Sequence, residues 1–303
     1  MKNRLNGGQR LKAVFKGMGC VSMMAGFSAL MASAAQAEGY ARKWQFGFQE
    51  PVTPIARQLV SFHDFLLVII TLVTLFVMGL LFYVIKNFNE KANPVPSKTT
   101  HNTTIEVIWT IVPILVLLVI AIPSFRLLFA QYDYPKPDLV IKATGNQWYW
   151  SYEYPDADAM SFDALMLRDD NSVPIKGPNG EPRVLAVDNY VYVPVNKNVE
   201  VLVTASDVIH AWAVPAFGVK VDAVPGRVMR TWFRAEKIGT YYGQCSELCG
   251  KDHGYMPIAV KVVSQADYEA WLKKAKQEYA SGEPNLKKSK NTRLAAIKPA
   301  ISR

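Results

Sequence analysis

Four potential metal donors lie close together near the end of this sequence. Cys245, Cys249, His253 and Met256 are spaced C-x3-C-x3-H-x2-M, and a further histidine, His210, lies 35 residues before Cys245. The chain has only three cysteines and four histidines, so this concentration is unusual. Thiolate, imidazole and thioether groups are the ligands that copper, zinc and iron–sulfur centres prefer. The spacing therefore predicts a site for a soft metal ion.

Several kinds of site could use these residues. A disulfide between Cys245 and Cys249 would suit an oxidising compartment, but it leaves His253 and Met256 without a role. A structural zinc site would use two thiolates and two imidazoles and would gain nothing from a thioether. A mononuclear blue-copper site needs two histidines, one cysteine and a weak axial methionine, so it leaves one cysteine over.

A pair of metal ions uses the whole set. Two thiolates can bridge two soft ions, which leaves one imidazole for each ion. Met256 can complete one shell, and a backbone carbonyl between Cys245 and Cys249 must complete the other. Such a shell has no open position for a substrate, so we expect the site to carry electrons.

The first 37 residues have the pattern of an export signal. They contain five basic residues and no acidic one, then an apolar stretch from about residue 17 to 35, and then the cleavage signature Ala35-Gln36-Ala37. We expect residues 1–37 to be removed, Cys20 with them, and the mature chain to begin at Glu38. An uncleaved membrane helix is the alternative interpretation.

Two long apolar runs follow, Phe65 to Ile85 and Val107 to Phe125, of 21 and 19 uncharged residues. Each is long enough to cross a bilayer, and the alternative is a pair of buried core helices. We predict an exported segment at 38–60, membrane helices at 61–86 and 106–130, and a loop at 87–105. Three lysines against one glutamate at this loop (Lys86, Lys91, Lys98 and Glu90) place it in the cytoplasm.

Residues 131–265 have short alternating runs of β-branched and aromatic residues, separated by Pro, Gly, Asn and Asp. This pattern predicts an antiparallel β-sandwich or Greek-key barrel. The expected strands are 139–142, 147–154, 190–195, 199–204, 211–214, 228–233, 240–242 and 258–263. Ser264 with Asp267 resembles a capping box that opens a helix to about Tyr279, and this helix and a lysine-rich tail make up segment 266–303.

The formal net charge of +9 does not indicate a nucleic-acid-binding protein. Residues 1–37 and 267–303 each carry an excess of five positive charges, so the rest of the chain has a net charge of −1. Between the two ends there is no basic face with interleaved aromatic residues. We therefore expect no nucleic-acid partner, and we expect the tail to contact anionic lipid or a protein.

The metal-donor motif resembles that of a known family. His210 together with CSELCGKDHGYM at 245–256 is similar to the binuclear copper centre, CuA, of cytochrome c oxidase subunit 2. GNQWYWSYEY at 145–154, DAVPGR at 222–227 and EVIWTIVP at 106–113 also resemble stretches of that subunit, in the same order. The resemblance runs from about residue 46 to 271, and every ligand position matches.

This resemblance implies a membrane-anchored all-β protein, in which a two-helix transmembrane hairpin precedes a cupredoxin-like Greek-key β-barrel. It implies that the chain is subunit 2 of a cytochrome c oxidase in the inner membrane of a bacterium, with the copper domain in the periplasm. Electrons would come from cytochrome c and pass to a haem in subunit 1, where oxygen is reduced to water with coupled proton translocation. The copper ligands would be His210, Cys245, Cys249, His253, Met256 and the carbonyl of Glu247.

The resemblance also assigns roles to three other groups. The Glu247 carboxylate would reach a magnesium or manganese ion shared with subunit 1, although alone it could be a solvated loop carboxylate. Trp148 would be the residue at which electrons enter. Glu106 would lie at the mouth of a proton path into subunit 1, and a capping box with Thr103 would by itself account for a glutamate there.

Two further expectations concern residues 147–170. If 147–154 is a strand, Trp148 shares one face with Trp150, Tyr152 and Tyr154, and this face is expected to be buried. Six acidic residues fall within 18 residues that contain one base, Arg168. Such a patch would steer a basic partner such as cytochrome c, although any one of its carboxylates could simply be solvated. These residues are Glu153, Asp156, Asp158, Asp163, Asp169 and Asp170.

Three other functions compete with this interpretation. A quinol oxidase subunit 2 would have the hairpin and the β domain but would lack the copper ligands. A periplasmic reductase with a similar copper pair, such as nitrous oxide reductase, would have no helix hairpin and would need a second large domain. A copper chaperone would not purify as part of a multi-subunit complex.

Overall fold

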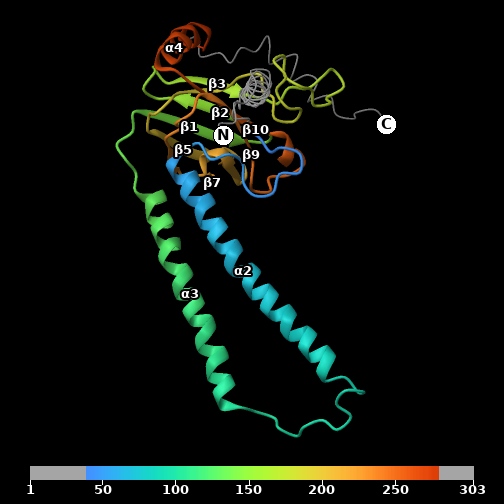
Figure 1. Cartoon of the computed structure of the whole chain (residues 1–303). Coiled ribbons are helices and arrows are strands. Elements are labelled where there is room, and N and C mark those ends of the chain that lie inside the picture. The colour runs from blue at the N-terminus through green and yellow to red at the C-terminus, as the bar shows by residue number, and fades with distance from the viewer. Residues whose placement is uncertain (1–38, 280–303) are drawn as a thin grey trace, which may run out of the picture. The chain divides into compact units, whose positions relative to one another are not determined.

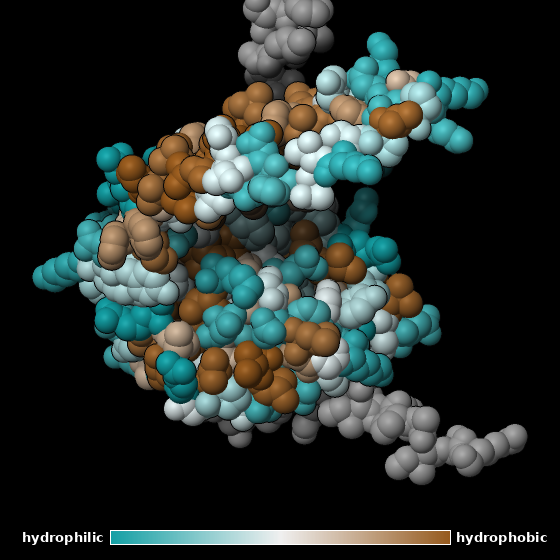
Figure 2. All heavy atoms as spheres, turned by 90° about the horizontal axis from the view of Figure 1, so that it is seen from below, coloured by the Kyte–Doolittle hydropathy of each residue, from teal (hydrophilic) through white to brown (hydrophobic). Residues whose placement is uncertain are grey.

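The computed structural model describes residues 39–279, which form two membrane-type helices, a β domain and a final helix (Figure 1). The predicted export signal at 1–37, with Cys20, and the lysine-rich tail after residue 279 lie outside the described residues. Both apolar runs are helical: α2 spans Pro54–Asn87 and α3 spans Thr103–Tyr132. Both are long and apolar enough to cross a membrane, and the most apolar part of each is not buried. In the view of Figure 2, hydrophobic residues are exposed over much of the surface.

The start of each helix is capped by a side chain. Thr53 accepts a hydrogen bond from the amide of Ala56 at 3.0 Å, and Pro54 occupies the first turn of α2, where its missing N–H costs nothing. The cap of α3 is Asn102, whose side chain accepts from the amide of Ile105 at 3.2 Å. The predicted capping role of Thr103 is therefore wrong, because the helix begins one residue earlier than that role requires, and Thr103 is its first helical residue. Glu106 still reaches back, and its Oε1 accepts from the amide of Asn102 at 3.3 Å.

The β domain contains ten strands among the described residues. They are β1 Leu139–Asn146, β2 Tyr149–Tyr154, β3 Met160–Ala164, β4 Val191–Pro194, β5 Val199–Ala205, β6 His210–Val214, β7 Val219–Ala223, β8 Met229–Phe233, β9 Gly239–Gln244 and β10 Pro257–Val263. They form a five-stranded sheet in the order β3-β2-β1-β5-β8, a three-stranded sheet in the order β4-β10-β9, and the pair β6-β7. This is a β-sandwich, as predicted, and among residues 39–279 the ladders do not close into a barrel.

The sheets are mixed and not purely antiparallel as expected. β1 is parallel to β5, with Leu139 opposite Val199, and β10 is parallel to β4, with Val260 opposite Val191. Parallel neighbours cannot be joined by a tight turn, so these pairs bring distant parts of the chain together. Local sequence patterns do not contain that information. β3 and β7 were also not predicted.

Alternation along the strands builds the core. In β1 and β5, buried residues alternate with partly exposed ones over the whole strand, as expected when one face packs inward. Large aromatic side chains fill the interior, including Trp150, Tyr152, Tyr154 and Trp212, all at most 1% exposed. β6 is buried along its whole length, so it lies inside the domain and places His210 there.

Helix α4, Gln265–Tyr279, begins as predicted, because Ser264 Oγ accepts from the amide of Asp267 at 3.1 Å. Trp271 of α4 stacks on Tyr192, with ring centroids 4.7 Å apart.

Helix α2 is attached directly to the β domain by hydrogen bonds at its N-terminal end. The amide of Val52 donates to the carbonyl of Ala216 at 3.0 Å, and Thr53 Oγ1 donates to that of Phe217 at 2.8 Å.

Candidate metal centre

Two segments that are distant in sequence supply the five predicted side-chain donors. His210 is the first residue of β6, and the other four lie in the loop between β9 and β10. The amide of Ser246, beside Cys245, donates to the carbonyl of Ala211 at 3.2 Å and ties the loop to the start of β6. The loop connects the antiparallel strands β9 and β10, so the sheet fixes both of its ends.

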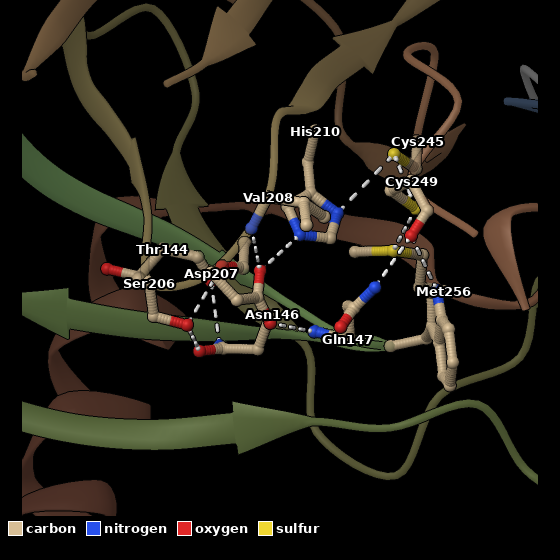
Figure 3. A network of polar contacts seen from close by, with 12 residues as sticks. Thr144, Asn146, Gln147, Ser206, Asp207, Val208, His210, Cys245, Cys249 and Met256 are labelled. Atoms are coloured by element: carbon tan, nitrogen blue, oxygen red, sulfur yellow. Dashed lines mark hydrogen bonds and ion pairs between the residues drawn. The ribbon is translucent and has the colours of Figure 1, made fainter. Parts of the chain in front are cut away.

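The donors form a chain of close contacts centred on the two sulfur atoms (Figure 3). Cys245 Sγ lies 3.9 Å from His210 Nδ1 and 3.3 Å from the carbonyl oxygen of Glu247. Cys249 Sγ lies 3.5 Å from His253 Nδ1 and 3.6 Å from Met256 Sδ. Each thiol therefore has one imidazole and one weaker donor beside it. His253 belongs to a short 3-10 turn, η2, at His253–Tyr255.

The two sulfur atoms are 3.8 Å apart, and neither cysteine is in a disulfide. A disulfide bond would bring them to about 2.05 Å. A zinc–sulfur bond of about 2.3 Å is longer than half of the separation of 3.8 Å, so one ion of this kind can contact both sulfur atoms. Ligand atoms of His210, Cys245 and Cys249 all lie within 4.8 Å of one another. The residues present therefore fit a soft-metal site.

Burial and charge favour a bound cation. His210 is 0% exposed and Met256 is 1% exposed. Burial raises the pKa of Cys245, but hydrogen bonds with His210 and with backbone groups outweigh it and lower that pKa. Burial and the neighbouring charge of Cys245 raise the pKa of Cys249. The pair loses its first proton easily and its second with difficulty, and a metal cation would compensate the second negative charge.

Asp207 connects the centre to the turn between β1 and β2. Its Oδ1 lies 2.9 Å from Nε2 of His210, and its Oδ2 accepts from the amide of Gln147 at 2.7 Å. Burial would lower the pKa of His210, but hydrogen bonds with Cys245 and Asp207 raise it. A carboxylate on the outer nitrogen of a ligating imidazole fixes the orientation of the ring. Asp207 thus acts on the centre through His210.

Trp148 lies in that turn and not in a strand. β2 begins at Tyr149, so the predicted strand is wrong at its first two residues, and Trp148 does not share the buried face of Trp150. It is half-buried, and its Nε1 donates to the carbonyl of Cys249 at 3.2 Å. The Gln147 amide group donates to the same carbonyl at 3.0 Å. The turn therefore places Trp148 against the metal-ligand loop.

Gly250 makes this contact possible. Its φ is +119°, a conformation that favours glycine, and a Cβ atom there would lie 3.1 Å from the Trp148 ring. Sequence reasoning missed Gly250, Gln147 and Asp207. Gly250 follows Cys249, Gln147 precedes Trp148, and Asp207 lies three residues before His210, so each is near a candidate residue in the sequence. Their contacts, however, depend on the fold.

The other predicted residues lie elsewhere. Glu247 is exposed in the ligand loop, and Glu106 lies in the first turn of α3.

The six acidic residues between Glu153 and Asp170 have different surroundings. Glu153 pairs with Lys142 at 3.1 Å and Asp158 with Lys276 at 2.7 Å, and Asp163 accepts from Ser151 at 2.7 Å. Asp169 caps its own loop, while Asp156 and Asp170 are exposed.

Together, a β-sandwich with two buried thiols, two imidazoles and a thioether, attached to two apolar helices, defines a membrane-anchored, cupredoxin-like metalloprotein. Residues 139–263 match the family model described as cytochrome c oxidase subunit II, periplasmic domain, and residues 41–127 match that of its transmembrane domain. The chain belongs to the cytochrome c oxidase subunit II family. It is thus a subunit of an oxidoreductase complex.

Two relatives of similar length agree with this assignment. The probable cytochrome c oxidase subunit 2 of Rickettsia bellii is 51% identical over 253 residues, which are 84% of this chain and 90% of that protein. The cytochrome c oxidase subunit 2 of Cereibacter sphaeroides is 46% identical over 276 residues, 85% of this chain and 91% of that protein. Among solved structures, the chain is similar to the crystal structure of the periplasmic domain of subunit II of cytochrome oxidase of Bradyrhizobium japonicum, with 55% sequence identity and a TM-score of 0.44. The alignment covers 48% of this chain and 99% of the chain in that structure.

Proposed function

We propose that this chain accepts electrons from cytochrome c at a binuclear copper centre, CuA, and passes them to haem in subunit 1. There oxygen is reduced to water, with coupled proton translocation. The observation that carries the proposal is the pair of unlinked sulfur atoms 3.8 Å apart, each with its own imidazole and weak donor. When bound, the copper pair supplies reversible one-electron transfer.

The ligand roles follow from which donors lie together. Cys245 and Cys249 would bridge the two ions, and His210 and His253 would each bind one. Met256 and the carbonyl of Glu247 would be the weak donors. Met256 Sδ contacts Cys249 Sγ, and the Glu247 carbonyl contacts Cys245 Sγ. Each cysteine therefore has one of the two weak donors beside it.

Trp148 is proposed as the residue at which electrons enter. Its side chain is half-buried, and its Nε1 donates a hydrogen bond to the backbone carbonyl of Cys249, whose thiol is a proposed ligand. The docking surface for cytochrome c would include the acidic residues named above. Asp169 and Asp170 are adjacent to Arg168, which pairs with Asp252 of the ligand loop at 3.7 Å.

The remaining assignments concern the surroundings in the complex. The Glu247 side chain would bind magnesium or manganese at the boundary with subunit 1, and Glu106 would stand at the mouth of a proton path. We place the β domain, residues 131–265, on the periplasmic side of a bacterial inner membrane and loop 87–105 in the cytoplasm. The chain would contact subunit 1, other oxidase subunits and membrane lipid.

Copper stoichiometry with electron paramagnetic resonance tests the proposal. The full-length chain in detergent, loaded with copper under thiol-protecting conditions, should bind two coppers and share one unpaired electron equally between two nuclei. Cys249→Ser should lose this signal, and Met160→Leu, in the core away from the centre, should keep it. One copper with a single-nucleus signal in the unaltered chain would overturn the proposal.

A further inference from the structure

A groove of about 710 Å³ lies between α2 and α3 at the ends of the helices nearest the β domain. Arg57, Gln58 and Ser61 contribute polar groups from α2, and Arg126 contributes a guanidinium from α3. No acidic residue is among those that line it. The groove therefore combines two positive charges with neutral hydrogen-bond donors.

The two arginines differ in how their charge is balanced. Arg57 pairs with Glu236 at 2.7 Å, but Glu236 also faces Arg234 at 3.4 Å, so one carboxylate serves two guanidinium groups. Arg126 makes no hydrogen bond or ion pair with any residue between 39 and 279. The groove thus keeps an excess of positive charge.

The positions of these arginines are not explained by membrane topology. In the proposed orientation they lie at the exported end of the hairpin, whereas Lys86 and Lys91 lie at the cytoplasmic end, where an excess of basic residues is expected. A guanidinium without a partner beside an apolar membrane span is costly, so we expect it to bind an anionic group. Phosphate is well suited, because a guanidinium can donate two parallel hydrogen bonds to it.

The rest of the groove is hydrophobic. Phe62, Phe65 and Leu127 also line it, and Leu67 and Phe125 continue an exposed apolar surface along the two helices. A ligand that fills the site must therefore be anionic at one end and apolar at the other. Inorganic phosphate would leave the apolar wall uncovered.

We propose that this groove binds the head group of an anionic phospholipid, with its phosphate at Arg126 and Arg57 and its acyl chains along α2 and α3. Gln58 and Ser61 are placed to hydrogen-bond the glycerol or phosphate oxygens. The binding depends on the helix hairpin and not on the metal centre, so it is expected in the metal-free chain as well.

Native mass spectrometry of the full-length chain in mild detergent tests this inference. The chain should retain one phosphatidylglycerol in preference to phosphatidylcholine, and Arg126→Gln should reduce that preference about fivefold, the effect of one basic residue near anionic lipid. The matched control is Lys86→Gln, which removes one charge at the other end of α2 and should keep the preference. Equal affinity for both lipids, or an unchanged preference in Arg126→Gln, would refute the site.

Two further measurements identify the occupant. Millimolar inorganic phosphate should not displace the lipid, and displacement would indicate a free-anion site instead. In the assembled oxidase, a photo-crosslinking benzoylphenylalanine at Phe65 should give an adduct of lipid mass. An adduct with a neighbouring subunit would mean that protein covers the groove, and the proposal would be wrong.

Discussion

Asp207 Oδ1 lies 2.9 Å from Nε2 of His210, while the other oxygen of the same carboxylate holds the amide of Gln147. One side chain therefore orients a proposed metal ligand and fixes the turn that carries Trp148. Burial raises the pKa of Asp207, but hydrogen bonds from His210 and from backbone amides outweigh it and lower the pKa. The carboxylate is thus charged when it accepts these bonds.

Asp207→Ala should weaken copper binding about 10- to 100-fold, because the His210 ring loses the group that orients it. Competition with a copper chelator measures the affinity. Asp207→Asn keeps one acceptor oxygen and should have a smaller effect. Equal affinities in Asp207→Ala and the unaltered chain would show that Asp207 does not position His210.

Met256→Leu should alter the copper spectrum without unfolding the domain. The substitution nearly conserves volume at a site that is 1% exposed, so we expect a loss of stability below about 1.5 kcal/mol. Paramagnetic resonance and thermal unfolding are measured together. Met160→Leu is the control, since Met160 is 4% exposed and outside the centre. Loss of both coppers from a folded Met256→Leu chain would contradict the weak-donor role.

Gly250→Ala should destabilise the β domain by at least about 1 kcal/mol, because alanine disfavours a positive φ. It should also displace the Trp148 ring, which the new methyl group would meet at 3.1 Å. Urea unfolding reports the first effect, and the indole N–H resonance of Trp148 reports the second. Gly254→Ala, in the same loop with open space around it, should change neither. Similar behaviour of the two variants would refute the close-contact explanation.

Trp148→Phe should slow reduction of the copper centre by cytochrome c about tenfold, equivalent to ~1.4 kcal/mol of activation free energy. The aromatic ring is kept, but the Nε1 bond to the carbonyl of Cys249 is lost. Stopped-flow reduction gives the rate, and the paramagnetic signal should be unchanged. Trp271→Phe, on α4, serves as the control. Equal rates in both variants would remove Trp148 from the electron path.

Asp170→Asn should lower the association rate of cytochrome c at low ionic strength, because the exposed Asp170 is free to steer a basic partner. Asp158→Asn should matter less, since Asp158 already pairs with Lys276 at 2.7 Å. The rates are compared between low and high salt. If both substitutions reduce the rate equally, pairing within the chain does not decide which carboxylates steer.

The sequence was most informative where function depends on residue type. The proximity of the five candidate donors, the two apolar helices and the cap at Ser264 could all be predicted from spacing and composition. The position of Trp148 could not, because alternation continues through GNQWYW while the chain turns at Gln147 and Trp148. The cap of α3 is displaced by one residue for a similar reason: Asn102 and Thr103 can both cap a helix, and only the backbone conformation selects Asn102.

Contacts that join distant segments were the least predictable. Asp207 and Gln147 are 60 residues apart, and Gln147 and Cys249 are 102 apart. Nothing in the local pattern of either segment indicates its partner. The parallel pairings of β1 with β5 and of β4 with β10 have the same origin.

The parallel pairing of β10 with β4 also sets the order in which this domain can form. β4 can pair with β10 only after β10 has been synthesised, about 65 residues later in the chain. All donors of the metal loop precede β10. A chain translocated from its N-terminus cannot close the loop until nearly the whole domain has crossed the membrane. In the proposed topology, copper insertion would therefore follow export, and the thiols of Cys245 and Cys249 would be unprotected until then.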